Sequence, residues 1–252
     1  MKHVSTALIN NQQYLQITCS YLRVSYLKIL RSLLIIICLN CMAGNQVLFA
    51  QWSSDPGINT LICTAPDFRY FPQIIQGDEG SSIIVWLDRR NGSTTDIYAQ
   101  RINAAGIAQW AANGVTVCTA EGDQYAHRIV SDGAGGAIIT WYDYRNGNTA
   151  DIYAQRINAS GVPEWTANGV AVCTAPNTQS APTIINDGGG GAIIAWDDYR
   201  DGSSSDIYAQ YINAAGVMKW TANGIAVCTA SNAQHFPALD LGGNRKCYHY
   251  MV

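Results

Sequence analysis

The chain has 252 residues, of which 48% are hydrophobic and 13% are charged, and its formal net charge at pH 7 is −3. This composition predicts an ordered protein with enough apolar material for a core, and it excludes a disordered tail. Residues 1–50 hold four basic and no acidic side chains, which leaves 11 basic and 18 acidic side chains in residues 51–252. The negative balance excludes nucleic acid and anionic membranes as partners, since both bind cationic surfaces.

Residues 1–50 show the pattern of a secretory signal peptide. Lys28 and Arg31 precede an apolar run at Leu33–Gly44, and the small residue Ala50 offers a cleavage site. The run is too short for a membrane span, which needs about 20 apolar residues. We therefore expect a signal peptide at 1–50 and a secreted, extracellular or cell-surface chain with no stable membrane span after its removal. A periplasmic location and a retained anchor are the alternatives.

After residue 50, the sequence consists of an internal repeat of 55 residues. Trp86, Trp141 and Trp196 stand 55 residues apart, and each copy ends in a similar cysteine-containing segment. In the copy at 181–230, turn residues separate four short segments rich in β-branched and aromatic side chains, at 182–187, 192–199, 206–213 and from 220 onward. Four such segments joined by short links predict an antiparallel four-stranded meander.

A single meander cannot bury both of its faces, so neighbouring copies must stack on one another. About 50 residues and four strands per unit are typical of a β-propeller blade. The predicted fold class is therefore all-β, with propeller-type repeats over residues 51–240 and three complete blades at about 72–120, 127–175 and 182–230. Partial strands are expected at 52–65 and 236–240. Residues 241–252 break the repeat and are expected to be an aberrant or out-of-frame tail, with a truncated gene product as the alternative.

The run GAIITWYDYRNGNTADIYAQRINASGVPEW at Gly136–Trp165 resembles blades of secreted propellers of the sialidase-like and Tol-Pal periplasmic families. The shared features are a strand ending in tryptophan, a turn with an acidic residue and an arginine, and a strand beginning DIY. The resemblance covers most of residues 72–230, although the Asp-box Ser-x-Asp-x-Gly-x-x-Trp of sialidases is absent. It implies the blade fold and leaves activity open, because such propellers include hydrolases, receptors and scaffolds.

An aspartate and an arginine two residues later recur in the second turn of every copy. A feature present in every blade is expected to support the fold that every blade shares. The turn between the second and third strands needs partners for its backbone groups: aspartate can accept from the turn amides, and arginine can bind a carboxylate with two donors. We expect a structural role for Trp86, Asp88, Arg90, Trp141, Asp143, Arg145, Trp196, Asp198 and Arg200. The alternative is one calcium site per blade, formed by the pairs Asp88 and Asp96, Asp143 and Asp151, and Asp198 and Asp206. No other cofactor is expected.

The repeated cysteines are interpreted as small buried side chains, because equivalent positions one blade apart are too distant for a disulfide. Catalysis finds little support in the sequence. A glycosidase needs two carboxyl groups in different environments, whereas the glutamates after residue 50, Glu79, Glu121 and Glu164, all lie in predicted turns. We therefore expect no enzymatic activity.

The links between consecutive repeats vary in sequence, which indicates binding rather than support of the fold. The candidate binding residues in these links are Phe68, Tyr70, Tyr125, His235 and Phe236. The predicted function is a secreted or cell-surface binding or scaffold module whose partner is an unidentified extracellular protein or a glycan. The alternative is a fragment of a sialidase-like glycan-processing enzyme.

Overall fold

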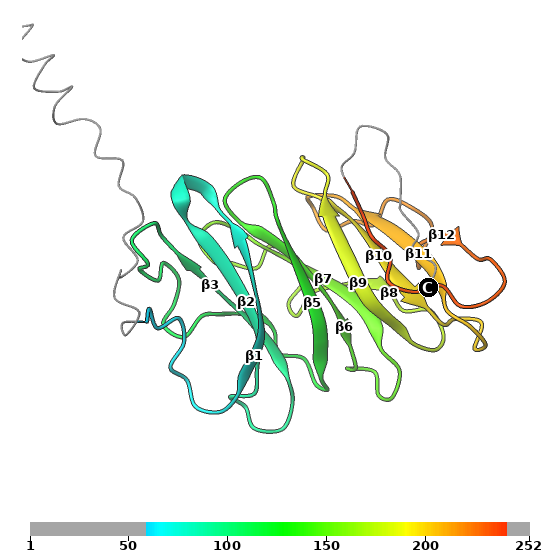
Figure 1. Ribbon diagram of the computed structural model, residues 1–252, viewed down its shortest axis with the longest axis horizontal. Coiled ribbons are helices and arrows are strands. Elements are labelled where there is room, and N and C mark those ends of the chain that lie inside the picture. Colours follow the sequence, from blue (N-terminus) through cyan, green and yellow to red (C-terminus); the bar gives the residue numbers. More distant parts are fainter. Residues whose placement is uncertain (1–58, 241–252) are drawn as a thin grey trace, which may run out of the picture. The chain divides into compact units, whose positions relative to one another are not determined.

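The computed structural model describes residues 59–240 (Figure 1). The expected signal peptide at 1–50 and the expected tail at 241–252 lie outside the described residues. Residues 59–240 belong to one compact unit of the chain, Ala50–Val252. They form strands and a single 3-10 turn at Asp78–Gly80, and this part of the chain has no helix that is long and apolar enough to cross a membrane.

Twelve strands in residues 59–240 form three antiparallel sheets of four, and in each sheet the order of the strands follows the chain. The first sheet contains β1 (Arg69–Gln76), β2 (Ser82–Asp88), β3 (Asp96–Ile102) and β4 (Val115–Cys118). The second contains β5 (Gln124–Ser131), β6 (Ala137–Asp143), β7 (Asp151–Ile157) and β8 (Val170–Cys173). The third contains β9 (Gln179–Asn186), β10 (Ala192–Asp198), β11 (Asp206–Ile212) and β12 (Ile225–Cys228). The predicted all-β fold, with three propeller-type blades of four strands each, is confirmed.

The strand boundaries differ from the sequence expectation at two places. The first strand of the third blade was expected at 182–187, but β9 begins at Gln179 and continues through a bulge at Ala181 and Pro182. Pro182 lies inside the strand at this bulge, and a bulge is one of the places where a strand tolerates proline. The lone strands expected at 52–65 and 236–240 are not strands in their described parts, 59–65 and 236–240.

The repeated aspartate of each blade lies at the centre of a buried polar cluster. Asp88 is fully buried and accepts from the Trp86 indole N–H (2.8 Å), from the Arg90 backbone N–H (2.8 Å) and from the Arg90 guanidinium (2.5 Å). Burial would raise the pKa of Asp88, but the hydrogen bonds from Arg90 and Trp86 offset this effect and hold its pKa below the ordinary value. The carboxyl therefore stays ionised inside the blade.

The arginine of the cluster connects three strands of its blade. The Arg90 guanidinium carbon lies 3.7 Å from the centre of the Tyr98 ring on β3. The same side chain donates to the Asn113 carbonyl, just before β4, at 2.9 Å. The equivalent arginines lie 3.7 Å from the Tyr153 ring and 3.5 Å from the Tyr208 ring. Each second turn thus joins the end of the second strand to the third strand and to the start of the fourth.

The same arginine also joins one blade to the preceding one. Arg145 of the second blade donates to the Cys118 sulfur of the first blade at 3.3 Å, and the Thr119 backbone N–H donates to the Asn168 side chain at 3.0 Å. Burial raises the pKa of Cys118 to about 12, so the thiol stays protonated. Cys173 repeats these contacts at the next interface. Before the first blade, Cys63 and Thr64 make the corresponding contacts with Arg90 and Asn113.

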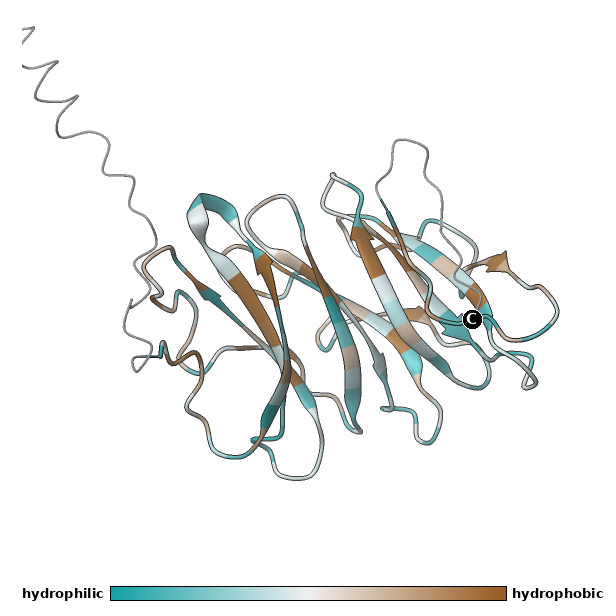
Figure 2. Cartoon of the chain, in the orientation of Figure 1, coloured by the Kyte–Doolittle hydropathy of each residue, from teal (hydrophilic) through white to brown (hydrophobic). Residues whose placement is uncertain are grey.

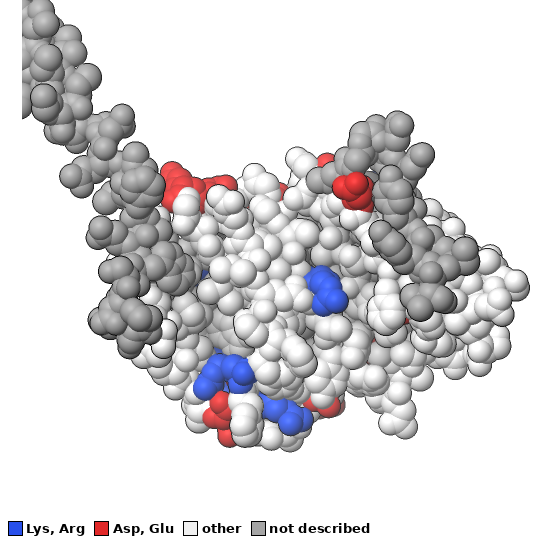
Figure 3. All heavy atoms as spheres, in the orientation of Figure 1, with Lys and Arg blue, Asp and Glu red and all other residues white. Residues whose placement is uncertain are grey.

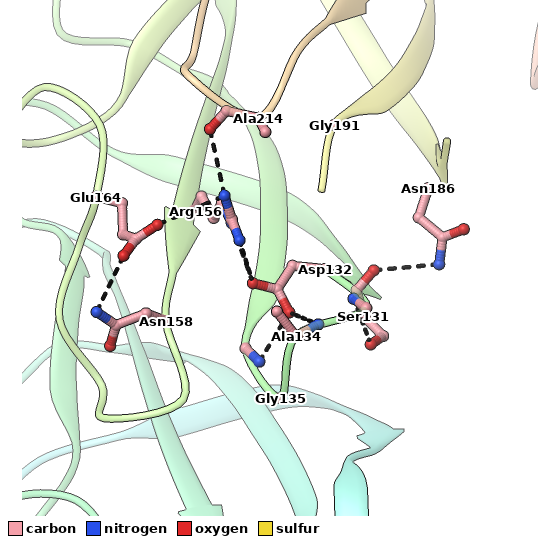
Figure 4. A network of polar contacts seen from close by, with 12 residues as sticks. Ser131, Asp132, Ala134, Gly135, Arg156, Asn158, Glu164, Asn186, Gly191 and Ala214 are labelled. Carbon is pink, nitrogen blue, oxygen red and sulfur yellow. Dashed lines mark hydrogen bonds and ion pairs between the residues drawn. The ribbon is translucent and has the colours of Figure 1, made fainter. Parts of the chain in front are cut away.

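A second set of contacts joins the blades near the turn between the third and fourth strands. The Trp110 indole N–H donates to the Ala159 carbonyl of the next blade at 3.0 Å. Arg156 binds the Asp132 carboxylate within its own blade at 2.9 Å and the Ala214 carbonyl of the next blade at 3.3 Å (Figure 4). Two apolar clusters span the two interfaces, and the most hydrophobic stretches lie mainly on the strands (Figure 2).

Replacing Asp143 with alanine should lower the free energy of unfolding by about 3 kcal/mol, because the Trp141 indole, the Arg145 guanidinium and a turn amide lose their shared acceptor. Denaturant unfolding followed by tryptophan fluorescence measures this loss. Glu121→Ala, at an exposed position in the link after β4, is the control and should unfold at the parent's midpoint. Equal midpoints for Asp143→Ala and the parent would contradict a structural role for the buried cluster.

Candidate functional site

A groove of about 630 Å³ lies where the first strands of consecutive blades meet. β5 and β9 are neighbours in the structure, and the segment that follows β12 completes the lining. The lining residues are Ala126, Arg128, Tyr142, Ser180–Thr183, Asp197, Tyr199 and His235–Pro237. Three successive copies of the repeat therefore build a single site.

Backbone bulges shape the groove. Ala126 and Ala181 have left-handed φ angles of 47° and 48°, and the pairing of the first strand with the second shifts register beside both. Phe71 and Phe236 occupy the same position of the repeat, with φ angles of 50° and 57°. Such angles are unfavourable for residues with a Cβ, and bulges of this kind re-aim side chains near functional sites. Because alanine stands at two of the four positions, space remains that a phenylalanine ring would fill.

Asp197 is the buried carboxyl of the groove, and it breaks the repeat. The equivalent positions on β2 and β6 carry Leu87 and Tyr142. One oxygen of Asp197 lies 3.1 Å from His235 Nδ1, and the other accepts the Phe236 backbone N–H at 2.9 Å. Burial raises the pKa of Asp197 above its ordinary value, although the hydrogen bonds from His235 and Phe236 act in the opposite direction.

The residues around Asp197 present an aromatic rim. Phe236 is 72% exposed, and the His235 ring lies 6.0 Å from it and 6.2 Å from the Tyr199 ring. The Ser205 hydroxyl lies 2.9 Å from His235 Nδ1 and also binds the Gln234 carbonyl. The segment after β12 is thus fixed by Asp197 and Ser205 of the third blade, and it holds its two aromatic side chains at the groove.

Charge is sparse on the face of the molecule in Figure 3, where most of the described surface is uncharged. Arg128 is the basic residue of the groove lining, and one of its guanidinium nitrogens donates to the His127 carbonyl at 3.1 Å. A groove with one buried carboxyl and one basic side chain suits a neutral ligand with many hydroxyl groups better than a polyanion.

The groove includes two of the five binding residues expected from the sequence, His235 and Phe236. Tyr125 lies next to the groove and packs on the rings of Tyr142 and Tyr144, at 6.0 and 6.3 Å. The remaining two belong to the first blade, outside the lining: the Tyr70 hydroxyl lies 2.9 Å from the Thr95 hydroxyl, and the Phe68 side chain is 76% exposed.

Sequence analysis missed Arg128, Asp197 and Tyr199. A signal for Asp197 is present in the aligned copies, which read WLD, WYD and WDD at this strand end. The groove forms at a position where the copies differ, and the residues that the copies share lie outside it.

The aspartate pairs considered for calcium are engaged by other groups. Both oxygens of Asp88 accept from Arg90, and Asp96 Oδ2 accepts from Asn91 at 2.6 Å. Among residues 59–240, no group of three or more His, Cys, Asp or Glu side chains gathers as a metal site would require.

His127 is a second departure from the repeat, and it lies outside the groove lining. The other copies have proline there, at Pro72, Pro182 and Pro237. His127 is buried beside the first blade, where the Gln73 side chain donates to its carbonyl at 2.8 Å. Burial lowers the pKa of His127 to about 4, so its ring is neutral at pH 7.

Comparisons with known proteins give distant structural similarities alone. No protein-family model matches the chain, and no curated protein matches its sequence. Among solved structures, an endo-arabinase from Bacteroides thetaiotaomicron VPI-5482 is 15% identical with a TM-score of 0.42, over 71% of this chain and 72% of its own. A thermostable family-43 glycoside hydrolase is 11% identical with a TM-score of 0.41, over 68% and 61% of the two chains. An α-L-arabinofuranosidase from Lactobacillus brevis is 8% identical with a TM-score of 0.39, over 72% and 66%.

The expectation of a chain without enzymatic activity is contradicted by these comparisons, because all three of these structures are of enzymes. The expectation relied on the absence of a paired carboxyl motif in the sequence. Carboxyl groups that are distant in the sequence can form a pair after folding, and such a pair leaves no motif. At these identities and TM-scores, the similarity assigns neither a reaction nor a substrate to this chain. None of the three is named as a sialidase, so the finer resemblance to sialidase-like propellers stays a prediction.

His127→Pro, which restores the residue of the other copies, should flatten the pH dependence of stability in acid. Between pH 6.5 and about 4 the unfolded chain binds a proton at His127 that the folded chain does not. The parent should therefore lose about 3 kcal/mol of unfolding free energy as the pH falls through this window, and the variant should lack this contribution. Urea titrations from pH 7 to pH 4 measure the difference. Parallel curves for the parent and the variant would contradict the neutral buried histidine.

Proposed function

We propose that the chain binds a neutral glycan in the groove between the second and third blades. The observation that carries the proposal is Asp197, a buried carboxyl at a position where the other blades have Leu87 and Tyr142. It holds both His235 and the backbone of Phe236 at the groove. One substitution in the repeat thus supplies a polar group to the groove and orients its exposed aromatic side chain.

The chemistry of the lining suits sugars. A sugar ring has an apolar C–H face that can pack on an aromatic ring such as Phe236, and hydroxyl pairs that can bond to planar polar groups. Arg128 and His235 provide donors, and the Asp197 carboxylate provides acceptors. A volume of about 630 Å³ falls in the usual range for a small-molecule site, about 300–1,000 Å³. The groove therefore has room for a short stretch of a glycan.

The stability of the fold gives a second argument. Because burial raises the pKa of Asp197, its contribution to stability is present at acidic pH and is lost as the pH rises through the folded-state pKa. Burial thus disfavours the charged form of Asp197 in the folded chain, a penalty that leucine or tyrosine at this position in the other blades does not carry. A buried group with a raised pKa in a groove is typical of a functional site.

Glycan cleavage is a second candidate function, and the raised pKa of Asp197 is the observation that favours it. A carboxyl group that stays protonated closer to neutral pH can donate a proton to the leaving oxygen of a glycosidic bond. Glycosidases pair this acid with a second carboxyl group, and the groove lining supplies one carboxyl, that of Asp197. Cleavage would need a further carboxyl from beyond the lining residues. Export from the cell remains a prediction from residues 1–50.

Phe236→Ala should weaken glycan binding about tenfold, or about 1.4 kcal/mol, because the apolar face of a sugar loses its packing surface. Isothermal titration calorimetry against a panel of neutral pentose and hexose oligosaccharides measures the change. Phe68→Ala removes an equally exposed ring outside the groove and is the matched control, which should bind as the parent does. The proposal fails if no member of the panel binds the parent, or if both variants bind equally well.

Asp197→Asn should abolish or strongly weaken binding while the free energy of unfolding at pH 7 stays equal to that of the parent or rises, because the buried charge is removed. Urea unfolding and calorimetry on the same preparations test both parts. A product assay on the bound oligosaccharide separates the two candidate functions. Reducing ends released by the parent but not by Asp197→Asn would support cleavage, and binding without release would support recognition alone.

A further inference from the structure

Three tyrosine side chains of the second blade lie together beside the groove. Tyr142 lines the groove, and the centre of its ring lies 6.0 Å from that of Tyr125 and 5.8 Å from that of Tyr144. The rings of Tyr125 and Tyr144 lie 6.3 Å apart. All three residues are half-buried, and we call them the tyrosine cluster. Through Tyr142, the groove is thus continuous with an aromatic surface outside its lining.

The tyrosine cluster occupies positions of the repeat that line the groove in the third blade. Tyr144 corresponds to Tyr199, and Tyr125 corresponds to Ser180, and both counterparts belong to the groove lining. Equivalent positions of stacked repeats lie on the same face of the molecule. The tyrosine cluster therefore extends the surface of the groove onto the second blade.

Packing between the blades accounts for two of the three rings. Tyr125 packs on the apolar cluster between the first and second blades, and Tyr142 packs on the one between the second and third. Within residues 59–240, Tyr144 packs on neither apolar cluster. Its backbone is held independently of its ring, since the Tyr144 N–H donates to the Asp123 carbonyl at 2.9 Å and its carbonyl accepts from the Gly147 N–H at 3.0 Å. The Tyr144 ring is thus placed beside the groove without a role in either interface.

We propose that the tyrosine cluster is a second subsite for the same glycan, so that the ligand is an oligosaccharide with sugar units both in the groove and on the second blade. This inference rests on the proposed function of the groove. The occupant follows from continuity, because a glycan that leaves the groove over Tyr142 meets the Tyr144 ring next. A tyrosine ring packs on the apolar face of a sugar, and its hydroxyl can donate to or accept from a sugar hydroxyl.

The two subsites differ in chemistry. The groove contains the charged or polar side chains of Arg128, Asp197 and His235, which can orient a sugar by directional hydrogen bonds. The tyrosine cluster offers uncharged aromatic rings, whose packing on a sugar face is less selective. We therefore expect the groove to select the sugar unit and the tyrosine cluster to add affinity as the glycan becomes longer.

The dependence of affinity on chain length tests the proposal. Calorimetry uses the neutral oligosaccharide that binds the parent, as a length series from disaccharide to hexasaccharide. The parent should bind the longest member about tenfold more tightly than the shortest, a gain typical of one well-packed aromatic contact. Tyr144→Ala should bind the shortest member as the parent does and should lose most of the gain with length. Tyr144→Phe keeps the ring and should retain the gain.

Phe236→Ala is the complementary variant, because its ring lies in the groove and its loss should weaken the binding of short and long members alike. An affinity of the parent that does not rise with length, or an equal rise in Tyr144→Ala, would overturn the second subsite and leave the groove as a glycan site. Equal losses for short and long members in Tyr144→Ala would also overturn it, because Tyr144 would then act on the groove itself. A parent that binds no member of the series would overturn the proposed function and the second subsite together.

Discussion

The structure depends on one buried ion pair that occurs in every blade. Burying a carboxylate and a guanidinium is unfavourable unless their remaining donors and acceptors are satisfied. At Asp88 and Arg90 this condition is met by the Trp86 indole, the turn amide, the Tyr98 ring and the Asn113 carbonyl, and the Arg90 Nε–H donates to the Asp88 carboxylate. The ion pair therefore connects the second, third and fourth strands of one sheet.

The same ion pair couples one blade to the next. Arg145 also contacts the Cys118 sulfur of the preceding blade, and the Cys118 thiol lies 3.8 Å from the Asp143 carboxylate. A blade therefore completes its own polar cluster only when the end of the preceding fourth strand is present. This explains why Cys63 and Thr64 occupy the corresponding place before the first blade without forming a strand. Nearest-neighbour dependence of this kind is the general property of repeat proteins.

The groove arises where the repeat changes. Bulges recur in every copy, but alanine at Ala126 and Ala181 leaves room, and the aspartate at position 197 introduces a buried carboxyl. The residues that the blades share hold the strands of each blade together, and the groove forms at residues that differ between the blades.

The sequence by itself determined the fold class, the number of complete blades and the repeated Asp-x-Arg turns, because these depend on local patterns of strand and turn residues. It also indicated His235 and Phe236 as residues of a variable link. Only the tertiary structure decided which residues share a site. Asp197 and Phe236 are 39 positions apart, and their contact requires the third blade to close around the segment after β12. Burial, which raises the pKa of Asp197 and lowers that of His127, is likewise set by packing between strands that are distant in sequence.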